Sequence, residues 1–302
     1  MIPLPEVRVG APMRHESLTV FPLFAPGESR AEYLLSDEAM KTGAVTVEEV
    51  SEGGSVPTLL VVNDTNARVL FLEGEELRGA KQNRVLNTSV LVAAHSRTPI
   101  PVSCVEQGRW RYRSRQFSSE GTHSSSKLRL WLKESVSRSL KEGQGHTSDQ
   151  GQVWREVRRQ MAALDSSSAT GAMEDTYRAH GSRLTEFQDR LPYVEGASGL
   201  AVAVGQQVVA VDLFDKPATC RKVWQRLLTG VVLDAIEDFK SEPTAETADV
   251  SSLLSRVRDQ VWEHAPAVGE GQEFRADPDP TTHASALVLD DAMLHGSVVV
   301  AS

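Results

Sequence analysis

Residues 57–73 read PTLLVVNDTNARVLFLE, and this stretch decides the fold class. Two runs rich in β-branched and aromatic residues flank Asn63-Asp64-Thr65-Asn66, a sequence of turn-forming residues. The same rhythm continues along the chain, and the strands predicted in this region are 57–63, 67–73, 84–93 and 98–105. Connections this short cannot hold the crossover that parallel neighbours need. Residues 1–113 are therefore expected to be β-rich and mostly antiparallel.

Strand patterns also occur toward both ends of the chain. The strands expected there are 17–24, 43–50, 285–290 and 292–300, together with a hairpin formed by 200–204 and 208–213. Pro22 lies inside the first of these strands and cannot donate a ladder hydrogen bond. That strand is therefore expected at a sheet edge or at a bulge.

Helical patterns fill the middle of the chain. The helices expected are 127–141, 148–164, 171–190, a helix from Pro217 to about 240, and 249–264. Thr147 and Gln150 have the spacing of a capping box, and Asp215 is expected to cap the helix that carries Pro217 in its first turn. The Ser- and Gly-rich residues 114–126 are predicted to form a mobile loop.

Strands at both ends around a helical middle predict an α+β fold. We expect a mainly antiparallel sheet built from N- and C-terminal strands. The chain, 1–302, is expected to be a single domain in which a β-rich part (1–113), a helical part (127–190) and an α/β part (198–302) pack as one unit.

Composition restricts the partners. The formal net charge is −9, which disfavours long nucleic acids and anionic membranes as partners. No apolar run reaches the roughly 18 residues of a membrane span. The N-terminal MIPLPEVRVG does not look like a signal peptide, so the protein is expected to be cytoplasmic and its two cysteines, Cys104 and Cys220, reduced.

The most informative segment is 73–84, EGEELRGAKQNR. It joins two apolar strands, yet most of its residues are charged or carry an amide. Mixed carboxylates, amides and cations at strand ends are typical of binding and catalytic sites. The alternative is a solvated loop held by surface ion pairs.

A second informative segment is 101–110, PVSCVEQGRW, which contains Cys104 and Glu106. A cysteine beside a cation can have a depressed pKa and act as a nucleophile. The stronger interpretation is that Cys104, which lies among valines, is a small buried hydrophobic residue.

Four arginines follow at every second position: Arg109, Arg111, Arg113 and Arg115. In an extended chain they would share one face, opposite Trp110 and Tyr112. Guanidinium groups match phosphate oxygens, and the aromatic rings would stack on a base. The alternative is a strand whose aromatic residues enter the core while its arginines meet water or surface carboxylates. Because the rest of the chain is acidic, the arginines indicate a small phosphorylated ligand.

Carboxylates in these segments also offer hard oxygen ligands for a divalent cation such as magnesium or calcium. The residues concerned are Glu73, Glu75, Glu76 and Glu106. Their spacing is not diagnostic of any metal site.

The stretches GEELRGAKQNRVLNTSVLV and PVSCVEQGRW resemble the ADP-ribosylglycohydrolase- and rhodanese-phosphatase-associated domain family. The resemblance is most specific over about 70–112 and extends more weakly to the C-terminal strands. It implies an ADP-ribose-like ligand and a place in NAD-derived metabolism, and it carries no catalytic residues. The residues that stand in the family's motif are Glu75, Gly79, Lys81, Gln82, Asn83, Arg84, Cys104, Glu106, Gln107, Gly108, Arg109 and Trp110.

Three functions fit these residues. The first is an enzyme or processing factor, a hydrolase or transferase acting on an ADP-ribose-like nucleotide sugar. In it, Glu75 or Glu106 would be the general acid or base. The second is a binding module without catalysis for the same ligand, and the third is an interaction scaffold. The expected ligand contacts are phosphates at Lys81, Arg84, Arg109 and Arg111, and ribose or base at Gln82 and Asn83.

Overall fold

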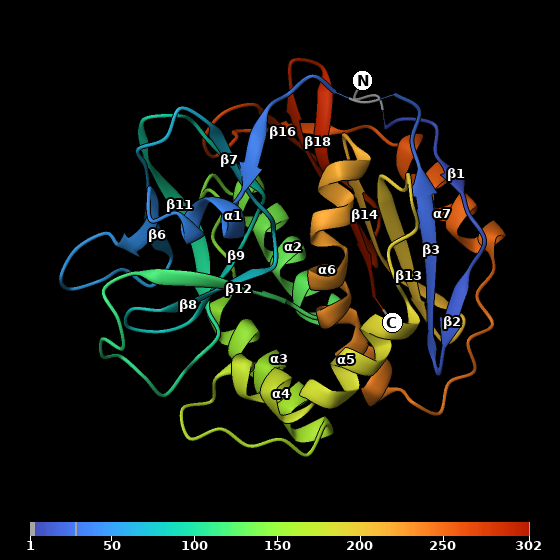
Figure 1. Ribbon diagram of the computed structural model, residues 1–302, viewed down its shortest axis with the longest axis horizontal. Helices are drawn as coiled ribbons and strands as arrows, with labels where there is room; N and C mark the ends of the chain where they lie inside the picture. The colour runs from blue at the N-terminus through green and yellow to red at the C-terminus, as the bar shows by residue number, and fades with distance from the viewer. Residues whose placement is uncertain (1–3, 28, 302) are drawn as a thin grey trace.

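The structure, a computed structural model, describes residues 4–27 and 29–301 and confirms the α+β class. The described residues form three sheets, shown in Figure 1. The largest has the order β1-β3-β13-β14-β18-β17-β16-β15, with β2 beside β3. Its strands are β1 (Arg8–Val9), β2 (Met13–His15), β3 (Leu18–Phe24), β13 (Gly199–Val204), β14 (Gln207–Phe214), β15 (Glu263–Ala265), β16 (Gln272–Asp279), β17 (Thr282–Leu289) and β18 (Ala292–Val300).

The other two sheets come from the first part of the chain. One has the order β12-β8-β9-β11-β6-β5, and the other β10-β7-β4. Their strands are β4 (Tyr33–Leu35), β5 (Val45–Glu49), β6 (Thr58–Asn63), β7 (Arg68–Phe71), β8 (Glu75–Gly79), β9 (Arg84–Leu86), β10 (Val90–Val92), β11 (Ser96–Cys104) and β12 (Phe117–His123). Apolar side chains from both sheets, such as Val69, Phe71, Leu59 and Val61, form one core cluster. The predicted turn at Asn63–Asn66 therefore links two packed sheets and is not a hairpin turn.

The helices are α1 (Ser36–Lys41), α2 (Ser126–Lys141), α3 (Gln150–Ala163), α4 (Met173–Ala179), α5 (Gly181–Arg190), α6 (Pro217–Glu237) and α7 (Thr247–Arg258). Figure 1 shows α2 and α6 between the large sheet and the two smaller sheets. Gly230 lies where α6 meets the chain after β12, and a Cβ atom there would lie 2.2 Å from the carbonyl oxygen of Ser124. Only glycine permits this approach.

The N-terminal strand β3 pairs with β13, so the ends of the chain share the large sheet as expected, whereas β5 to β12 do not join it. β3 also has neighbours on its other side, so it is not an edge strand, but the alternative of a bulge at Pro22 is confirmed: residues 10–12 stand opposite residues 21–22. The carbonyl of Pro22 faces Gly10, between β1 and β2, where the outer neighbour is interrupted. A ring without an N–H is tolerated at such a break.

Four local predictions are corrected. Residues 114–126 are not a mobile loop, because β12 pairs with β8 there. The expected helix 171–190 is two helices, α4 and α5. Asp149, rather than a Thr147–Gln150 box, caps α3, and Asp215 accepts a hydrogen bond from Tyr33 instead of capping α6.

A buried layer of charges joins the sheets through α2. Glu73, which follows β7, accepts a hydrogen bond from Lys133 of α2. Arg129, one turn earlier, binds Asp212 of β14 through two hydrogen bonds of 2.8 and 2.6 Å. Burial lowers the pKa of Lys133 to about 8, although Glu73 opposes the shift. Each of these charges has an opposite charge beside it, as buried ions require.

Within the described residues, none of the helices combines the length and apolar character needed to cross a bilayer.

Candidate functional site

The polar segment 73–84 folds as a buried hairpin. β8 and β9 pair antiparallel, and the turn between them contains Gly79 and Ala80, whose φ angles are 129° and 38°. The buried polar residues of the segment are Glu73, Glu75, Glu76, Lys81, Gln82, Asn83 and Arg84. The alternative of a solvated loop is therefore wrong.

β11 brings the second informative segment beside this hairpin. Cys104 lies opposite Arg84 in the ladder between β11 and β9. Two residues later, Glu106 accepts a hydrogen bond of 3.1 Å from the backbone N–H of Asn83. The segments 73–84 and 104–110 therefore lie side by side.

Arg109 closes this junction. Its Nε and Nη2 atoms donate to the two carboxylate oxygens of Glu106 at 2.8 and 2.6 Å, and its Nη1 donates to the carbonyl of Ala80 at 2.6 Å. Burial favours a higher pKa for Glu106, but hydrogen bonds from Arg109, Thr170 and the Asn83 backbone outweigh it and hold the pKa below its usual value. The hydrogen bonds of both side chains are therefore used within the fold.

Glu75 lies on the opposite face of β8 from Glu76, as the alternation of a strand requires. Its carboxylate accepts hydrogen bonds from Ser36 and Ser119, and it lies 3.4 Å from Nη1 of Arg226. Glu75 and Glu106 share none of these partners. The structure therefore does not bring the two predicted catalytic carboxylates together.

Glu76 lies close enough to Glu106 for the charge of Glu106 to act on it. Burial raises the pKa of Glu76 to about 7, and Glu174 and Glu106 add to the shift while Arg78 opposes it. One oxygen accepts a hydrogen bond of 2.9 Å from Arg78, and Oε1 is buried without a hydrogen-bond partner. Glu174, which comes from α4, was not singled out by the sequence because it lies 98 residues away from Glu76 in the chain (174 − 76).

Arg84 is fully buried, and only part of its guanidinium group is hydrogen-bonded. Its Nη1 donates to the backbone and side-chain oxygens of Gln82 at 3.1 and 3.3 Å. Among the described residues its Nε and Nη2 atoms have no hydrogen-bond partner, although Nη2 lies 3.7 Å from Oε1 of Glu49. Oε2 of Glu49 is also buried without a partner. Burial lowers the pKa of Arg84, with Glu49 among the groups that oppose the shift.

A cleft of about 920 Å³ opens beside this pair. One wall carries Glu48, Glu49, Ser51 and Glu52, and the other carries Tyr112, Arg113, Ser114 and Arg115. Lys81 lies at the junction of the walls. Its ammonium donates to the carbonyl of Glu52 and lies 5.0 Å from the Tyr112 ring and 5.5 Å from the Trp110 ring.

The segment 109–115 is not the extended strand expected from its alternation. Arg109 turns inward, whereas Arg111, Arg113 and Arg115 are exposed. Trp110 and Tyr112 are 46% and 51% exposed, so the alternative that these aromatic residues enter the core is wrong. The exposed face of this segment therefore carries cations and aromatic rings together.

Cys104 is buried, and burial raises the pKa of its thiol to about 11 although Arg84 opposes the shift. A thiol in this state is not an activated nucleophile. Cys104 and Cys220 are both free, which confirms that they form no disulfide.

The candidate glutamates do not form a cation site. Glu73, Glu75 and Glu106 each lie against a lysine or arginine, and Glu76 is bonded to Arg78. These charges leave no excess of negative ligands for magnesium.

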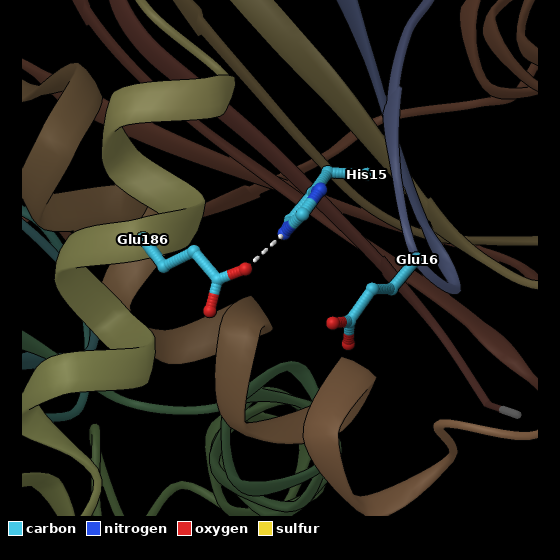
Figure 2. Close-up of side chains that lie close together, drawn as sticks. All are labelled: His15, Glu16 and Glu186. Atoms are coloured by element: carbon cyan, nitrogen blue, oxygen red, sulfur yellow. Dashed lines mark ion pairs between the residues drawn. The ribbon is translucent and has the colours of Figure 1, made fainter.

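Among the described residues, three ligand atoms suited to a metal converge at His15, Glu16 and Glu186. Figure 2 shows the His15 ring directed at Glu186, with Nε2 and the carboxylate 3.3 Å apart. Arg183 forms ion pairs with both Glu16 and Glu186. Its guanidinium already supplies the positive charge that a metal would bring, so this group does not fit a metal centre.

The fold and the buried polar hairpin define an α+β domain with a mixed-charge cleft. Residues 6–299 match the ARG and Rhodanese-Phosphatase-superfamily-associated Protein domain, and the chain belongs to this family. The searches of curated proteins and of solved structures gave no match.

Proposed function

We propose that the protein binds a small phosphorylated nucleotide sugar of the ADP-ribose type in the cleft beside Lys81. The observation that carries the proposal is the exposed face of 110–115, where Arg113 and Arg115 line the cleft beside Tyr112. In a chain with a net charge of −9, clustered exposed arginines beside aromatic rings fit a local anion that carries a base.

The family name supports the nature of the ligand. If its first term stands for ADP-ribosylglycohydrolase, the associated metabolism supplies ADP-ribose and related phosphosugars. An association of this kind identifies a class of ligand and says nothing about mechanism.

In this proposal the predicted ligand residues have two tasks. Arg111, Arg113 and Arg115 are exposed and meet the phosphates, and Lys81 lies beside them. Arg109 and Asn83 hold the hairpin in place through the contacts with Glu106. Gln82 accepts a hydrogen bond from Arg84, which lies next to Glu49 of the cleft wall.

Binding fits these side chains better than catalysis. Glu106 is held ionised by Arg109, and Glu75 is enclosed on the other face of β8. The carboxyl group suited to proton transfer near pH 7 is Glu76, but it is fully buried beneath Arg78. A hydrolase or transferase would need this group to be uncovered. We place the protein in the cytoplasm, with neither membrane nor long nucleic acid as a partner.

Thermal unfolding with ADP-ribose tests the proposal, with and without magnesium. A ligand that binds the native state alone stabilises it by about 2.7 kcal/mol at a hundredfold excess over its dissociation constant. The double variant Arg113→Ala/Arg115→Ala should bind at least tenfold more weakly. Arg155→Ala/Arg190→Ala removes the same charge from exposed helix positions and should bind as the wild type does.

If ADP-ribose, its phosphorylated forms and NAD all leave the unfolding transition unmoved under both conditions, the ligand proposal is wrong. The polar segments would then be better explained as an interaction scaffold.

A further inference from the structure

Glu49 lines the cleft and Arg84 lies next to it, and the two offer an acceptor and a donor edge that the protein itself leaves unused. Arg84 is fully buried, yet Nε and Nη2 have no hydrogen-bond partner in the part of the chain that the structure describes. Glu49 is 8% exposed, lines the cleft, and its Oε2 has no partner either. Unpaired polar atoms of this kind are costly in a folded protein and require an explanation.

The two groups lie together but do not satisfy each other. Nη2 of Arg84 is 3.7 Å from Oε1 of Glu49, which is too long for a hydrogen bond. The other contact of Oε1 is a 3.3 Å hydrogen bond from the backbone N–H of Lys81. The charges of Arg84 and Glu49 therefore neutralise each other. The Nε–Nη2 edge of Arg84 and Oε2 of Glu49 still lack hydrogen-bond partners among the described residues.

A phosphate does not suit this position. The guanidinium is already neutralised by Glu49, and Glu48 and Glu52 stand on the same wall of the cleft. An anion at Arg84 would lie against these carboxylates, and like charges at short range repel. The position instead suits an uncharged group that accepts from a guanidinium and donates to a carboxylate.

We propose that the Glu49–Arg84 pair binds the vicinal diol of an unmodified ribose, while the phosphates of the same ligand lie on the exposed arginines. One hydroxyl donates to Oε2 of Glu49, and the hydroxyl oxygens accept from Nε and Nη2 of Arg84. This inference rests on the proposed function and adds to it a requirement for a free ribose diol.

The pair is covered, so the ligand has to displace what lies over it. The Trp110 ring centre is 5.5 Å from the Arg84 guanidinium carbon. A Cβ atom built at Gly54 would lie 3.2 Å from Oε2 of Glu49, from Lys81 and from Trp110. Trp110 lies outside any helix or strand and is 46% exposed, so its side chain is the part of the cover that can move aside.

Calorimetry with matched ligands tests the inference. Wild-type protein is titrated with ADP-ribose, with the two analogues that lack the 2-hydroxyl of one ribose or the other, and with the forms phosphorylated at that hydroxyl. We expect one deoxy analogue, and the phosphorylated form at the same ribose, to bind at least tenfold more weakly than ADP-ribose. A site built to hydrogen-bond a hydroxyl rejects the analogue that lacks it.

Glu49→Gln keeps the size of the side chain and weakens the acceptor. This variant should bind ADP-ribose more weakly and lose the discrimination between ADP-ribose and the deoxy analogue. Glu156→Gln alters another buried, ion-paired glutamate and should retain both properties. If Glu49→Gln does not fold, the comparison of ligands on the wild type still decides the question.

The possible failures are distinct. No binding of ADP-ribose by the wild type overturns the proposed function and this inference with it. Binding of ADP-ribose and both deoxy analogues with equal affinity overturns the diol site alone, and so does unchanged discrimination in a folded Glu49→Gln variant.

Discussion

Single side chains in the hairpin show how burial sets the chemistry that is available. Glu76 and Glu106 lie close enough for their charges to interact, and they differ in their partners. Glu106 receives several hydrogen bonds and stays ionised, whereas Glu76 receives a hydrogen bond from Arg78 and keeps one bare oxygen. The pKa values of the two carboxyl groups are therefore moved in opposite directions.

Stability should depend on pH through Glu76. Its pKa is raised from 4.5 to about 7, so its contribution to folding is full below pH 4.5 and is lost as the pH rises through 7. Glu76→Gln has no proton to lose. Relative to the wild type, this variant should therefore gain on the order of 3 kcal/mol between pH 4.5 and pH 8. Urea unfolding across this pH range measures the free energy of unfolding of both proteins. A difference between the two that does not change with pH would contradict the prediction.

Arg109 is expected to contribute to the stability of the fold and not to contact the ligand directly. Arg109→Met leaves Glu106 buried without its cation, and breaking a buried pair in this way costs about 3–5 kcal/mol. Chemical denaturation measures the loss. Arg155→Met, at an exposed position of α3, should change stability by less than about 0.5 kcal/mol. A stable Arg109→Met variant that has lost only ligand binding would show that Arg109 contacts the ligand.

The alternation of residues in 109–115 fits an extended strand, but the prediction of a strand there is wrong. Period two predicts a strand only where a partner strand is present. After Glu106 the chain leaves β11, and Arg109 instead bonds to carbonyls in the turn of the neighbouring hairpin. That contact lies some 30 residues away along the chain, beyond what a local pattern can indicate.

At the scale of elements, strands with apolar runs were predictable and polar strands were not. The run at 58–63 and the hairpin of β13 and β14 were expected and occur. β12 was missed because its sequence, FSSEGTH, has the composition of a loop. It is a strand because β8 lies beside it, and β8 was itself hidden within the polar segment. The adjacency of the two informative segments was predictable, since short connections place successive strands together.

The turn between β8 and β9 offers a test at this scale. Gly79 has a φ of 129°, and a Cβ atom there would lie 2.6 Å from Oγ of Ser114 and 2.7 Å from the carbonyl of Gln116. Gly79→Ala should therefore destabilise the protein by about 1–3 kcal/mol. It should also loosen the wall of the cleft that carries Ser114.

Gly181→Ala provides the control for this test, because nothing lies within 4 Å of its added methyl group. Equal thermal shifts in the two variants would mean that the turn at Gly79 carries no strain.

Across the whole molecule, the buried charge layer links parts of the chain that the sequence showed only as separate segments. Glu73, Lys133 and Ser285 meet from three distant regions, and no local motif predicts such a meeting. The α+β class could be read from the order of strands and helices. The division of the strands among three sheets could not, because it depends on contacts between distant parts of the chain.

Lys133→Met should destabilise the whole fold by about 3–5 kcal/mol, since Glu73 would remain buried among polar groups without this cation. Adding Glu73→Gln should recover part of the loss, because a neutral amide is less costly to bury than a lone carboxylate. Denaturant unfolding of the two single variants and the double variant gives the coupling energy. Strictly additive losses would contradict a direct interaction.

The pairing of β3 with β13 also has a consequence during synthesis. β3 ends at Phe24 and β13 begins at Gly199. At about 5–20 residues per second, the ribosome completes the partner strand roughly ten to thirty-five seconds after β3. Until then, a strand whose Leu18, Val20 and Phe21 are fully buried in the finished protein lies open in the nascent chain. Translation that stalls before residue 199 prolongs this exposure, and a chaperone that shields the first thirty residues should raise the yield of folded protein.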